Sequence, residues 1–326
     1  MQSDPASESR DVVARDGLLY RCVRIRVGYF GGSCYWFWSC LQIEDLIDPV
    51  ANCRRGTALN EIVSRRVRFD GGTGQPLAGI VDAPVVARDD GSPVVVFAHC
   101  FTCNKDLKAI VRLSRLLARG GVSVLRFDMT GLGDSEGEFS RTDFLSNLAD
   151  LRKAIEFAGS DLGRVDGLVG HSLGGAAAMA VAGGEDVPGD LSSLVTLAAP
   201  SDTSHLAKLL VGMNPSIETE GQGEVSIGGR TWTIRREFVE QLRQYDLPGQ
   251  ISKIVLDTLS FHSPTDSTVA FDHALRIVNL IRGGDRGGRA SLVTLPGSDH
   301  LLTRFDRDWP FIAEMIAAFV RRHARQ

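Results

Sequence analysis

Two serines of the chain lie in the pattern Gly-x-Ser-x-Gly, which can present a serine hydroxyl as a nucleophile. The pattern reads GDSEG at 133–137 and GHSLG at 170–174. Such a serine needs a strand running directly into it, a helix starting directly after it, and flanking glycines, because the sharp turn leaves no room for a Cβ. GLVG precedes Ser172 and a run of small residues follows it, whereas the strand before Ser135 ends seven residues earlier. We therefore predict Ser172 as the nucleophile and Ser135 as a loop residue.

A serine hydroxyl is a weak nucleophile unless a histidine takes its proton and an acidic residue orients that histidine. The acid and then the histidine are expected after the serine, each on a loop that follows a strand. Asp266 follows KIVLDTLSF through HSPT, and His300 follows SLVTL through PGSD. We predict that Asp266 and His300 are the acid and the base. The weaker candidates for the acid are Asp257, Asp272 and Asp299.

Acyl transfer also needs backbone N–H groups that stabilise the negative charge developing on the carbonyl oxygen. One is expected from Leu173, the residue after the nucleophile, and one from the loop His99–Cys103 after the first buried strand. In that loop Phe101 is the predicted donor and Cys100 the alternative. A catalytic set of this kind requires neither a metal ion nor an organic cofactor.

All six cysteines lie in the first third of the chain, at Cys22, Cys34, Cys40, Cys53, Cys100 and Cys103. Because a disulfide framework would not leave the remaining two-thirds bare, we expect reduced thiols in a cytoplasmic protein. Cys100 and Cys103 form Cys-x-x-Cys before a helix, a spacing found in redox proteins and in half of a zinc site, but no second pair is present. We expect a structural or incidental role, with a redox-sensitive rim of the active site as the alternative.

The elements that must position these residues alternate between strands and helices from residue 64 onward. RRVRFD and LAGIVDAPV have the alternation of paired strands, and later strands are expected at 93–99, 122–128, 167–170, 194–200, 253–261 and 291–295. Helices are expected at 106–119, from Ser140, up to Ala182, near 268–282 and from about Phe311. This order predicts an α/β fold with a mostly parallel sheet and helices on both faces.

Residues 202–250 interrupt that alternation. EVSI-GG-RTWTI predicts a β-hairpin, since two glycines supply the positive φ of a two-residue turn, and a helix-like stretch follows around Phe238, Leu242 and Tyr245. An insertion between two strands lies over the carboxyl edge of the sheet, where ligands bind. We interpret 202–250 as a lid.

Residues 1–63 differ from the rest of the chain. They contain four of the six cysteines and the aromatic run Tyr35–Trp38, and neither helical nor alternating periodicity persists there. We interpret them as an N-terminal extension, poorly ordered or outside the folded domain 64–326, and expect them to be dispensable. The alternative is a docking or membrane-touching arm.

Composition excludes several classes of protein. With 326 residues, 43% hydrophobic content and a net charge of -4, the chain can bury a sizeable core but offers no electrostatic case for binding nucleic acid or an anionic membrane. No apolar run reaches the ~18–20 residues that a membrane-spanning helix needs. The opening MQSDPASESRD carries acids where a signal peptide needs a basic start, so we expect a cytoplasmic protein.

Residues from about 64 to 326 resemble the α/β-hydrolase superfamily, in its serine-aminopeptidase-like and prolyl-oligopeptidase-like esterase group. More narrowly, FAHCFTCNKDLKA, LRFDMTGLGDSEGEF, GHSLGGAA, FHSPTDSTV and SDHLL are similar to the hydrolase domain that some bacteria fuse to an osmotically-inducible-protein-C domain, which is absent here. The resemblance implies catalytic roles for Ser172, Asp266 and His300. It also implies a functional link to an organic hydroperoxide resistance protein.

These observations together predict a serine hydrolase that cleaves an acyl bond of a small-molecule substrate, a carboxylic ester above all, through an acyl-enzyme. Ester, thioester, amide and peptide share this machinery, so a serine peptidase or a thioesterase remains an alternative. A non-catalytic α/β-hydrolase-fold binding protein and a thiol-dependent redox protein that uses Cys100 and Cys103 are the others.

Overall fold

The computed structural model describes residues 9–13, 19–30, 33–42, 61–86, 92–188 and 190–324. The chain divides into two compact units, Met1–Ala58 and Leu59–Gln326. In the smaller unit the backbone forms an antiparallel sheet of β1 (Ser9–Val13), β2 (Leu19–Phe30) and β3 (Ser33–Gln42). Strands form here without sustained alternation in the sequence, and Val, Ile, Tyr and Trp favour extended backbone. The side chains of the aromatic run lie outside the described residues, and the dispensability of the extension stays a prediction.

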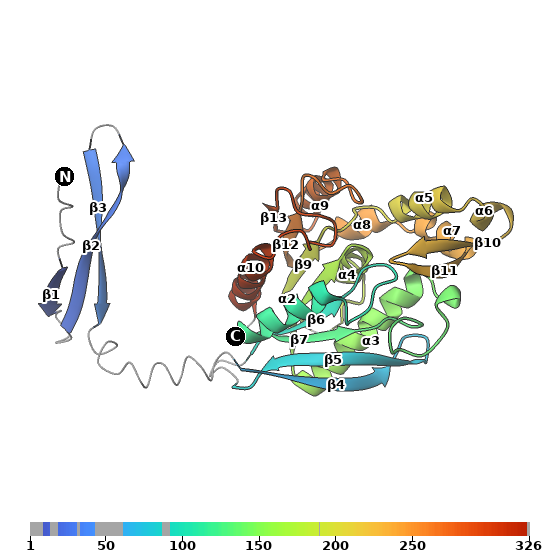
Figure 1. Cartoon of the computed structure of the whole chain (residues 1–326), viewed down its shortest axis with the longest axis horizontal. Coiled ribbons are helices and arrows are strands. Elements are labelled where there is room, and N and C mark those ends of the chain that lie inside the picture. Colours follow the sequence, from blue (N-terminus) through green and yellow to red (C-terminus); the bar gives the residue numbers. More distant parts are fainter. Residues whose placement is uncertain are drawn as a thin grey trace. The chain divides into compact units, whose positions relative to one another are not determined.

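The larger unit is built on an eight-stranded sheet in the order β13-β12-β9-β8-β6-β7-β5-β4 (Figure 1). Along the chain this sheet begins with an antiparallel hairpin of β4 and β5, and β5 also pairs antiparallel with β7. Every other pairing in this sheet is parallel. The strands are β4 (Ile62–Asp70), β5 (Pro76–Pro84), β6 (Val94–Ala98), β7 (Ser123–Phe127), β8 (Val165–His171), β9 (Ser193–Leu197), β12 (Asp257–His262) and β13 (Ala290–Thr294). The predicted mostly parallel sheet is confirmed.

Helices cover both faces of this sheet and bury its apolar residues in two clusters. One face packs against α2 (Lys108–Arg119) and α10 (Asp308–His323), the other against α3 (Phe144–Leu162), α4 (Leu173–Ala182) and α9 (Asp272–Gly283). The central strands β6 to β9 are buried along their whole length, which explains the continuous apolar run of β6 and the many apolar residues of the other three strands.

Several helix boundaries differ from the prediction. A short 3-10 turn, η2 (Phe139–Arg141), precedes α3, which begins at Phe144 rather than Ser140. The carboxylate of Asp143 accepts the backbone N–H of Ser146, and this capping interaction sets the start of the helix. The last helix begins at Asp308 rather than Phe311, and α9 begins at Asp272 rather than near 268.

The segment 202–250 forms a separate layer of short elements. These are α5 (Ser204–Met213), α6 (Ser216–Thr219), β10 (Gln222–Ile227), β11 (Arg230–Arg235), α7 (Arg236–Gln244) and α8 (Leu247–Ile251). The hairpin and the helix after it match the prediction: Gly228 and Gly229 have φ values of 61° and 75°, as a type I′ turn requires. The helices α5 and α6 were not predicted.

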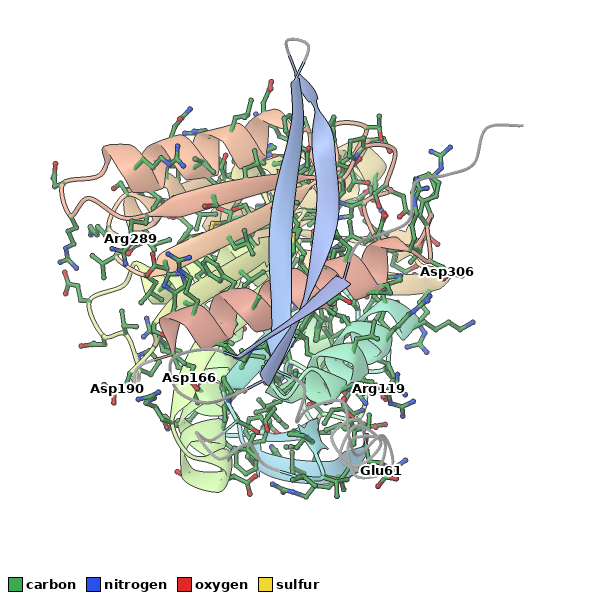
Figure 2. All side chains as sticks on the ribbon, turned by 90° about the vertical axis from the view of Figure 1, so that its left-hand side faces the viewer. Glu61, Arg119, Asp166, Asp190, Arg289 and Asp306 are labelled. Carbon is green, nitrogen blue, oxygen red and sulfur yellow. A yellow bond between two sulfur atoms is a disulfide. The ribbon has the colours of Figure 1, made fainter. Side chains whose placement is uncertain are left out.

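Charged side chains of both signs are spread over the surface of the larger unit, with Arg119, Arg289 and Asp306 among those labelled in Figure 2. Some of them are paired: the guanidinium of Arg289 donates to both oxygens of Asp257 at 2.6 and 2.7 Å. Within the described ranges, no helix combines the length and the apolarity that a membrane crossing demands.

Candidate active site

Ser172 occupies the sharp turn between β8 and α4. Its backbone has φ 53° and ψ -119°, a left-handed conformation that costs a non-glycine residue roughly 1–2 kcal/mol. The Ser172 N–H donates to the carbonyl of Leu197 at 2.9 Å, which ties the turn to the neighbouring strand β9. This geometry places the side chain at the carboxyl edge of the sheet, where a nucleophile can meet a ligand.

The glycines around Ser172 are dictated by space. A Cβ on Gly170 would lie 2.4 Å from the carbonyl oxygen of Gly174, and a Cβ on Gly174 would lie 2.2 Å from that of Ala98. Both close contacts are with backbone atoms, which a side-chain rotation cannot relieve. The pattern Gly-x-Ser-x-Gly is therefore a steric requirement of the turn.

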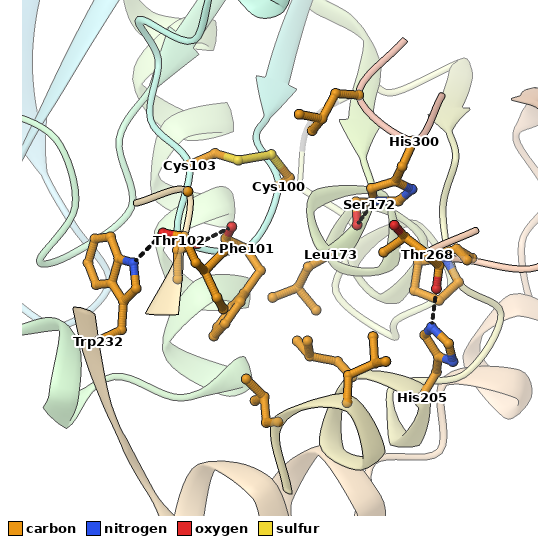
Figure 3. A pocket seen from close by; sticks show the side chains of 18 of the residues that line it. Cys100, Phe101, Thr102, Cys103, Ser172, Leu173, His205, Trp232, Thr268 and His300 are labelled. Atoms are coloured by element: carbon orange, nitrogen blue, oxygen red, sulfur yellow. Dashed lines mark hydrogen bonds between the residues drawn. A yellow bond between two sulfur atoms is a disulfide. The ribbon is translucent and has the colours of Figure 1, made fainter. Parts of the chain in front are cut away.

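The structure brings Ser172, His300 and Asp266 together from the ends of β8, β13 and β12. The Oγ of Ser172 lies 3.0 Å from Nε2 of His300, and Nδ1 of His300 lies 2.8 Å from Oδ2 of Asp266. The carboxylate of Asp266 is fully buried, whereas the imidazole of His300 is 14% exposed and faces the cavity (Figure 3). The three residues form one hydrogen-bonded line from a buried acid to an accessible hydroxyl.

The surroundings of Asp266 keep it ionised. Burial would raise the pKa of this carboxyl, but hydrogen bonds from His300 and from the backbone N–H groups of Val269 and Thr268 outweigh it and hold the pKa below its ordinary value. Those two N–H groups donate to Oδ1 at 3.0 and 2.8 Å, which leaves Oδ2 for the imidazole. The acid is thereby fixed in charge and in direction.

His171, immediately before Ser172, holds the loop that carries His300. It is buried, and its Nε2 lies 2.8 Å from the backbone carbonyl of His300. Burial, together with the charge of His300, lowers the pKa of His171 to about 4, so the ring stays neutral and donates through Nε2. The sequence analysis did not identify His171 as a functional residue, although it lies immediately before the predicted nucleophile.

The two residues predicted to supply the oxyanion donors line the same cavity as Ser172. Leu173 is the first residue of α4, where helix N–H groups have no intrahelical acceptor, and Phe101 lies in the loop after β6. His99 fixes that loop: its Nδ1 lies 2.8 Å from the carbonyl oxygen of Cys100, and its Nε2 accepts the N–H of Met129 at 3.2 Å. No sequence pattern indicates that His99 supports this loop.

Cys100 and Cys103 are joined by a disulfide. Our expectation of reduced thiols is wrong for this pair. The chain turns back between them, since the N–H of Cys103 donates to the carbonyl of Cys100 at 3.1 Å, and this brings the two Cα atoms to 5.3 Å. That separation lies within the range that a disulfide spans. The distribution of cysteines along the chain speaks against a long-range disulfide framework, but it does not exclude a bridge between two cysteines three residues apart.

The Alpha/beta hydrolase family model matches residues 95–324, from β6 to the end of the last helix. The chain belongs to the α/β-hydrolase family. The esterase domain of a Rhodothermus marinus protein is 35% identical, with 80% of this chain and 99% of that chain covered and a TM-score of 0.61. Est1E from Butyrivibrio proteoclasticus with ferulic acid bound is 22% identical over 79% and 99% of the two chains, with a TM-score of 0.67. Among curated proteins none matches the sequence.

A putative hydrolase from Agrobacterium vitis S4 is also similar, at 21% identity, 80% and 99% coverage and a TM-score of 0.61. The predicted fold class and superfamily are therefore confirmed. The narrower resemblance to the hydrolase of osmotically-inducible-protein-C fusions stays a prediction.

The candidate active site of this α/β-hydrolase opens into a cavity of about 400 Å³ (Figure 3). Ser172, His300 and the loop of Phe101 form its floor, and the segment 202–250 supplies much of its wall. That wall is mostly apolar and includes Leu206, Leu209, Leu210, Met213, Ile227 and Trp232. Residues of 202–250 therefore line the same cavity as the Ser172 hydroxyl, and the interpretation of this segment as a lid stays a prediction.

The segment 202–250 is hydrogen-bonded to the loop that carries Asp266. His205 of α5 has its Nε2 2.7 Å from the carbonyl oxygen of Thr268, two residues after Asp266 (Figure 3).

In the part of the chain that the structure describes, no three His, Cys, Asp or Glu side chains are grouped so that they could hold a metal ion.

Proposed function

We propose that this α/β-hydrolase is a serine hydrolase that cleaves carboxylic esters through an acyl-enzyme. The observation that carries the proposal is the line of hydrogen bonds from Asp266 through His300 to Ser172, which ends at an apolar cavity. A buried carboxylate, an oriented imidazole and an accessible hydroxyl are the parts that nucleophilic acyl transfer requires.

In the proposed reaction the Ser172 Oγ attacks the ester carbonyl while Nε2 of His300 takes its proton. The carbonyl oxygen becomes an oxyanion, which the N–H groups of Leu173 and Phe101 stabilise, helped by the positive end of α4. His300 then protonates the departing alcohol and leaves Ser172 acylated. In the second half of the reaction, water attacks the acyl-enzyme while His300 takes its proton, and the carboxylic acid product leaves. Asp266 stabilises the imidazolium in both halves of the reaction.

Three observations favour an ester over the alternatives. The cavity is walled by the lid and of small-molecule size, whereas a peptidase needs a cleft that admits an extended chain. The relative that is 35% identical is described as an esterase domain. A binding protein would need neither the strained serine nor its proton acceptor. A thioester differs from an ester only in its leaving group, so the same residues would cleave it by the same steps.

The identity of the nucleophile is tested with a fluorophosphonate probe followed by peptide mass spectrometry. We expect labelling at Ser172, no labelling of Ser172→Ala, and undiminished labelling of Ser135→Ala, which keeps the candidate site and loses the second Gly-x-Ser-x-Gly serine. Labelling that persists in Ser172→Ala would exclude the proposed nucleophile. Absence of labelling and of ester hydrolysis in the wild type would favour the binding-protein alternative.

The lid should set the choice of acyl group. Trp232 of β11 lines the cavity and packs edge-on against Phe139 with 4.8 Å between ring centroids. Trp232→Ala enlarges the cavity, so kcat/KM for long-chain p-nitrophenyl esters should rise relative to acetate by at least ~10-fold, the scale of a single methylene in an apolar pocket. The rate of fluorophosphonate labelling serves as the control. An equal loss on every ester would assign Trp232 to structure rather than to specificity.

A further inference from the structure

The Cys100–Cys103 disulfide lies in the wall of the active-site cavity. Both cysteines line the cavity that contains Ser172 and His300, and Figure 3 shows the bridge beside these residues. The two sulfur-bearing residues differ in exposure: Cys100 is buried at 5%, while Cys103 is partly exposed. A small thiol that enters the cavity therefore has access to Cys103 in particular.

The bridge closes a tight turn that includes Phe101 and Thr102. Thr102 has φ 57°, a left-handed conformation that a β-branched residue avoids unless its surroundings impose it. The two ends of the turn are held by the S–S bond and by the N–H of Cys103 donating to the carbonyl of Cys100. Breaking the S–S bond removes the covalent link across a strained turn and leaves hydrogen bonds to hold it, from the Cys103 N–H to the Cys100 carbonyl and from the Thr102 hydroxyl to the Phe101 carbonyl.

The same turn carries the proposed oxyanion donor. His99, which lies outside the turn, anchors its Cys100 end through the Cys100 carbonyl. The Cys103 end is held by the S–S bond and by the hydrogen bond of its own N–H, and both of these contacts lie within the turn. Between them, the ring of Phe101 stacks on Phe238 of the lid at 5.6 Å, so a shift of this turn changes both the N–H of Phe101 and the cavity wall. An oxyanion donor contributes only when its N–H points at the developing charge.

Stability gives little reason for such a bridge. A disulfide stabilises a fold by restricting the unfolded chain, and this effect is smallest for short loops; here the bridged residues are three apart. The strands and helices around the loop have an extensive buried core of their own. The bridge acts on the geometry of the loop rather than on the fold as a whole.

We propose that Cys100 and Cys103 form a redox-active site that controls the hydrolase, in which a dithiol reductant opens the disulfide and lowers acyl transfer. The inference rests on the proposed function, since it assigns Phe101 as an oxyanion donor.

The thiol chemistry proceeds in two exchange steps. A thiolate of the reductant attacks the Sγ of Cys103, the S–S bond breaks, and Cys100 leaves as a thiolate that takes a proton. The second thiol of the reductant then attacks the mixed disulfide and releases Cys103 as a thiol. The protein gains two electrons and two protons, and the reductant becomes its own disulfide; a disulfide oxidant reverses both steps.

The test compares oxidised and dithiothreitol-treated full-length protein, with the state of Cys100 and Cys103 read by differential alkylation and peptide mass spectrometry. Reduction should lower kcat for p-nitrophenyl acetate at least ~5-fold, up to the ~10²-fold or more that loss of an oxyanion donor costs, and change KM less than ~2-fold. Re-oxidation should restore kcat. Cys100→Ser/Cys103→Ser should have the reduced kcat and not respond to dithiothreitol.

A variant with serine at the four other cysteines, at 22, 34, 40 and 53, is the matched control and should respond like the wild type. An unchanged kcat when mass spectrometry finds both thiols reduced would overturn the proposal, and so would inhibition by dithiothreitol that persists in the double variant. If the double variant does not fold, the wild-type titration against alkylation state decides alone. Oxidised protein that neither hydrolyses esters nor reacts with fluorophosphonate would instead overturn the proposed function and this inference with it.

Discussion

The two Gly-x-Ser-x-Gly segments of the chain share a pattern and have opposite environments. In 170–174 a buried strand runs into Ser172, a helix starts after it, and the serine backbone is left-handed. In 133–137 the serine lies in the loop between β7 and η2, and its hydroxyl is fully engaged by backbone. The Oγ of Ser135 donates to the carbonyl of Asp128 at 2.6 Å and accepts the N–H of Ala78 at 2.9 Å.

The residue before each serine completes the contrast. His171 is buried, stays neutral and supports the loop of His300, whereas Asp134 is 70% exposed and pairs with Lys105 at 2.6 Å. One serine therefore faces a proton acceptor held for it by its neighbour, and the other is a structural crosslink in a polar loop. The five-residue pattern allows a nucleophile, but the flanking elements and the far ends of β12 and β13 decide whether there is one.

The largest expected difference between the two segments is in turnover. Ser172→Ala should lower kcat for p-nitrophenyl esters by ~10³–10⁶-fold, because the nucleophile, base and acid act as one unit. Ser135→Ala should keep kcat within ~2-fold of the wild type. Steady-state kinetics on both variants measures the contrast, and comparable losses in the two would erase it.

The acid of the Ser172 segment should come next in size. Asp266→Asn keeps the shape of the side chain but favours the wrong imidazole tautomer, so kcat should fall by ~10³–10⁴-fold. Asp299→Asn is the control, since the carboxylate of Asp299 accepts the N–H and the hydroxyl of Thr303 instead of the imidazole. A larger loss in Asp299→Asn than in Asp266→Asn would move the acid to Asp299.

The residues that precede the two serines should differ in their effect on acid stability. Since burial lowers the pKa of His171 to about 4, the unfolded chain binds a proton near pH 6.5 that the native chain refuses until about pH 4. This group alone should remove about 2 kcal/mol of unfolding free energy between pH 7 and pH 5.

The variant His171→Gln retains a donor for the His300 carbonyl. Between pH 7 and pH 5 it should lose about 2 kcal/mol less unfolding free energy than the wild type, as measured by urea denaturation. The matched change Asp134→Asn should leave the pH dependence unaltered there, because the Lys105 ammonium holds the pKa of Asp134 below its ordinary value. Parallel pH profiles for wild type and His171→Gln would contradict the assignment of His171 as a buried neutral group.

The two serine variants should also differ in stability, by an amount similar to the effect of His171. Ser135→Ala removes two hydrogen bonds and leaves the N–H of Ala78 without that acceptor, so the free energy of unfolding should fall by ~1–3 kcal/mol. Ser172→Ala removes a hydroxyl that faces the cavity and should change it by less than ~0.5 kcal/mol. Thermal or urea unfolding of the pair gives the answer, and equal destabilisation would mean that Ser172 is structural as well.

Sequence patterns predicted the elements whose residues all lie in the same environment, above all the strands that are buried along their whole length. The strands β6 to β9 are buried end to end and rich in apolar residues, and the hairpin turn is marked by Gly228 and Gly229, which its backbone requires. The positions of Ser172, Asp266 and His300 after three strands followed from the same patterns, and the structure brings them within hydrogen-bond distance.

The missed features depend on contacts that no local pattern encodes. Helix α5 was missed because several of its apolar residues line the cavity and only Ala207 and Leu210 are buried, so it has no clean core-facing stripe. The disulfide depends on a turn in which Thr102, a residue that does not signal positive φ, is left-handed. The support of the site by His99 and His171 requires knowing which carbonyls lie opposite their rings.

The strand that precedes His300 is one of the two edge strands of the eight-stranded sheet. β13 pairs with β12 on one side only and is partly exposed along its length, while Ser172 follows a central strand. Edge elements open more readily than the core, by fluctuations that leave the rest folded. Ester hydrolysis should therefore disappear at a lower urea concentration than the far-ultraviolet circular dichroism signal, and amide hydrogens of β13 should exchange before those of β8: an edge strand, and not the core, then sets the conditions under which the site is intact.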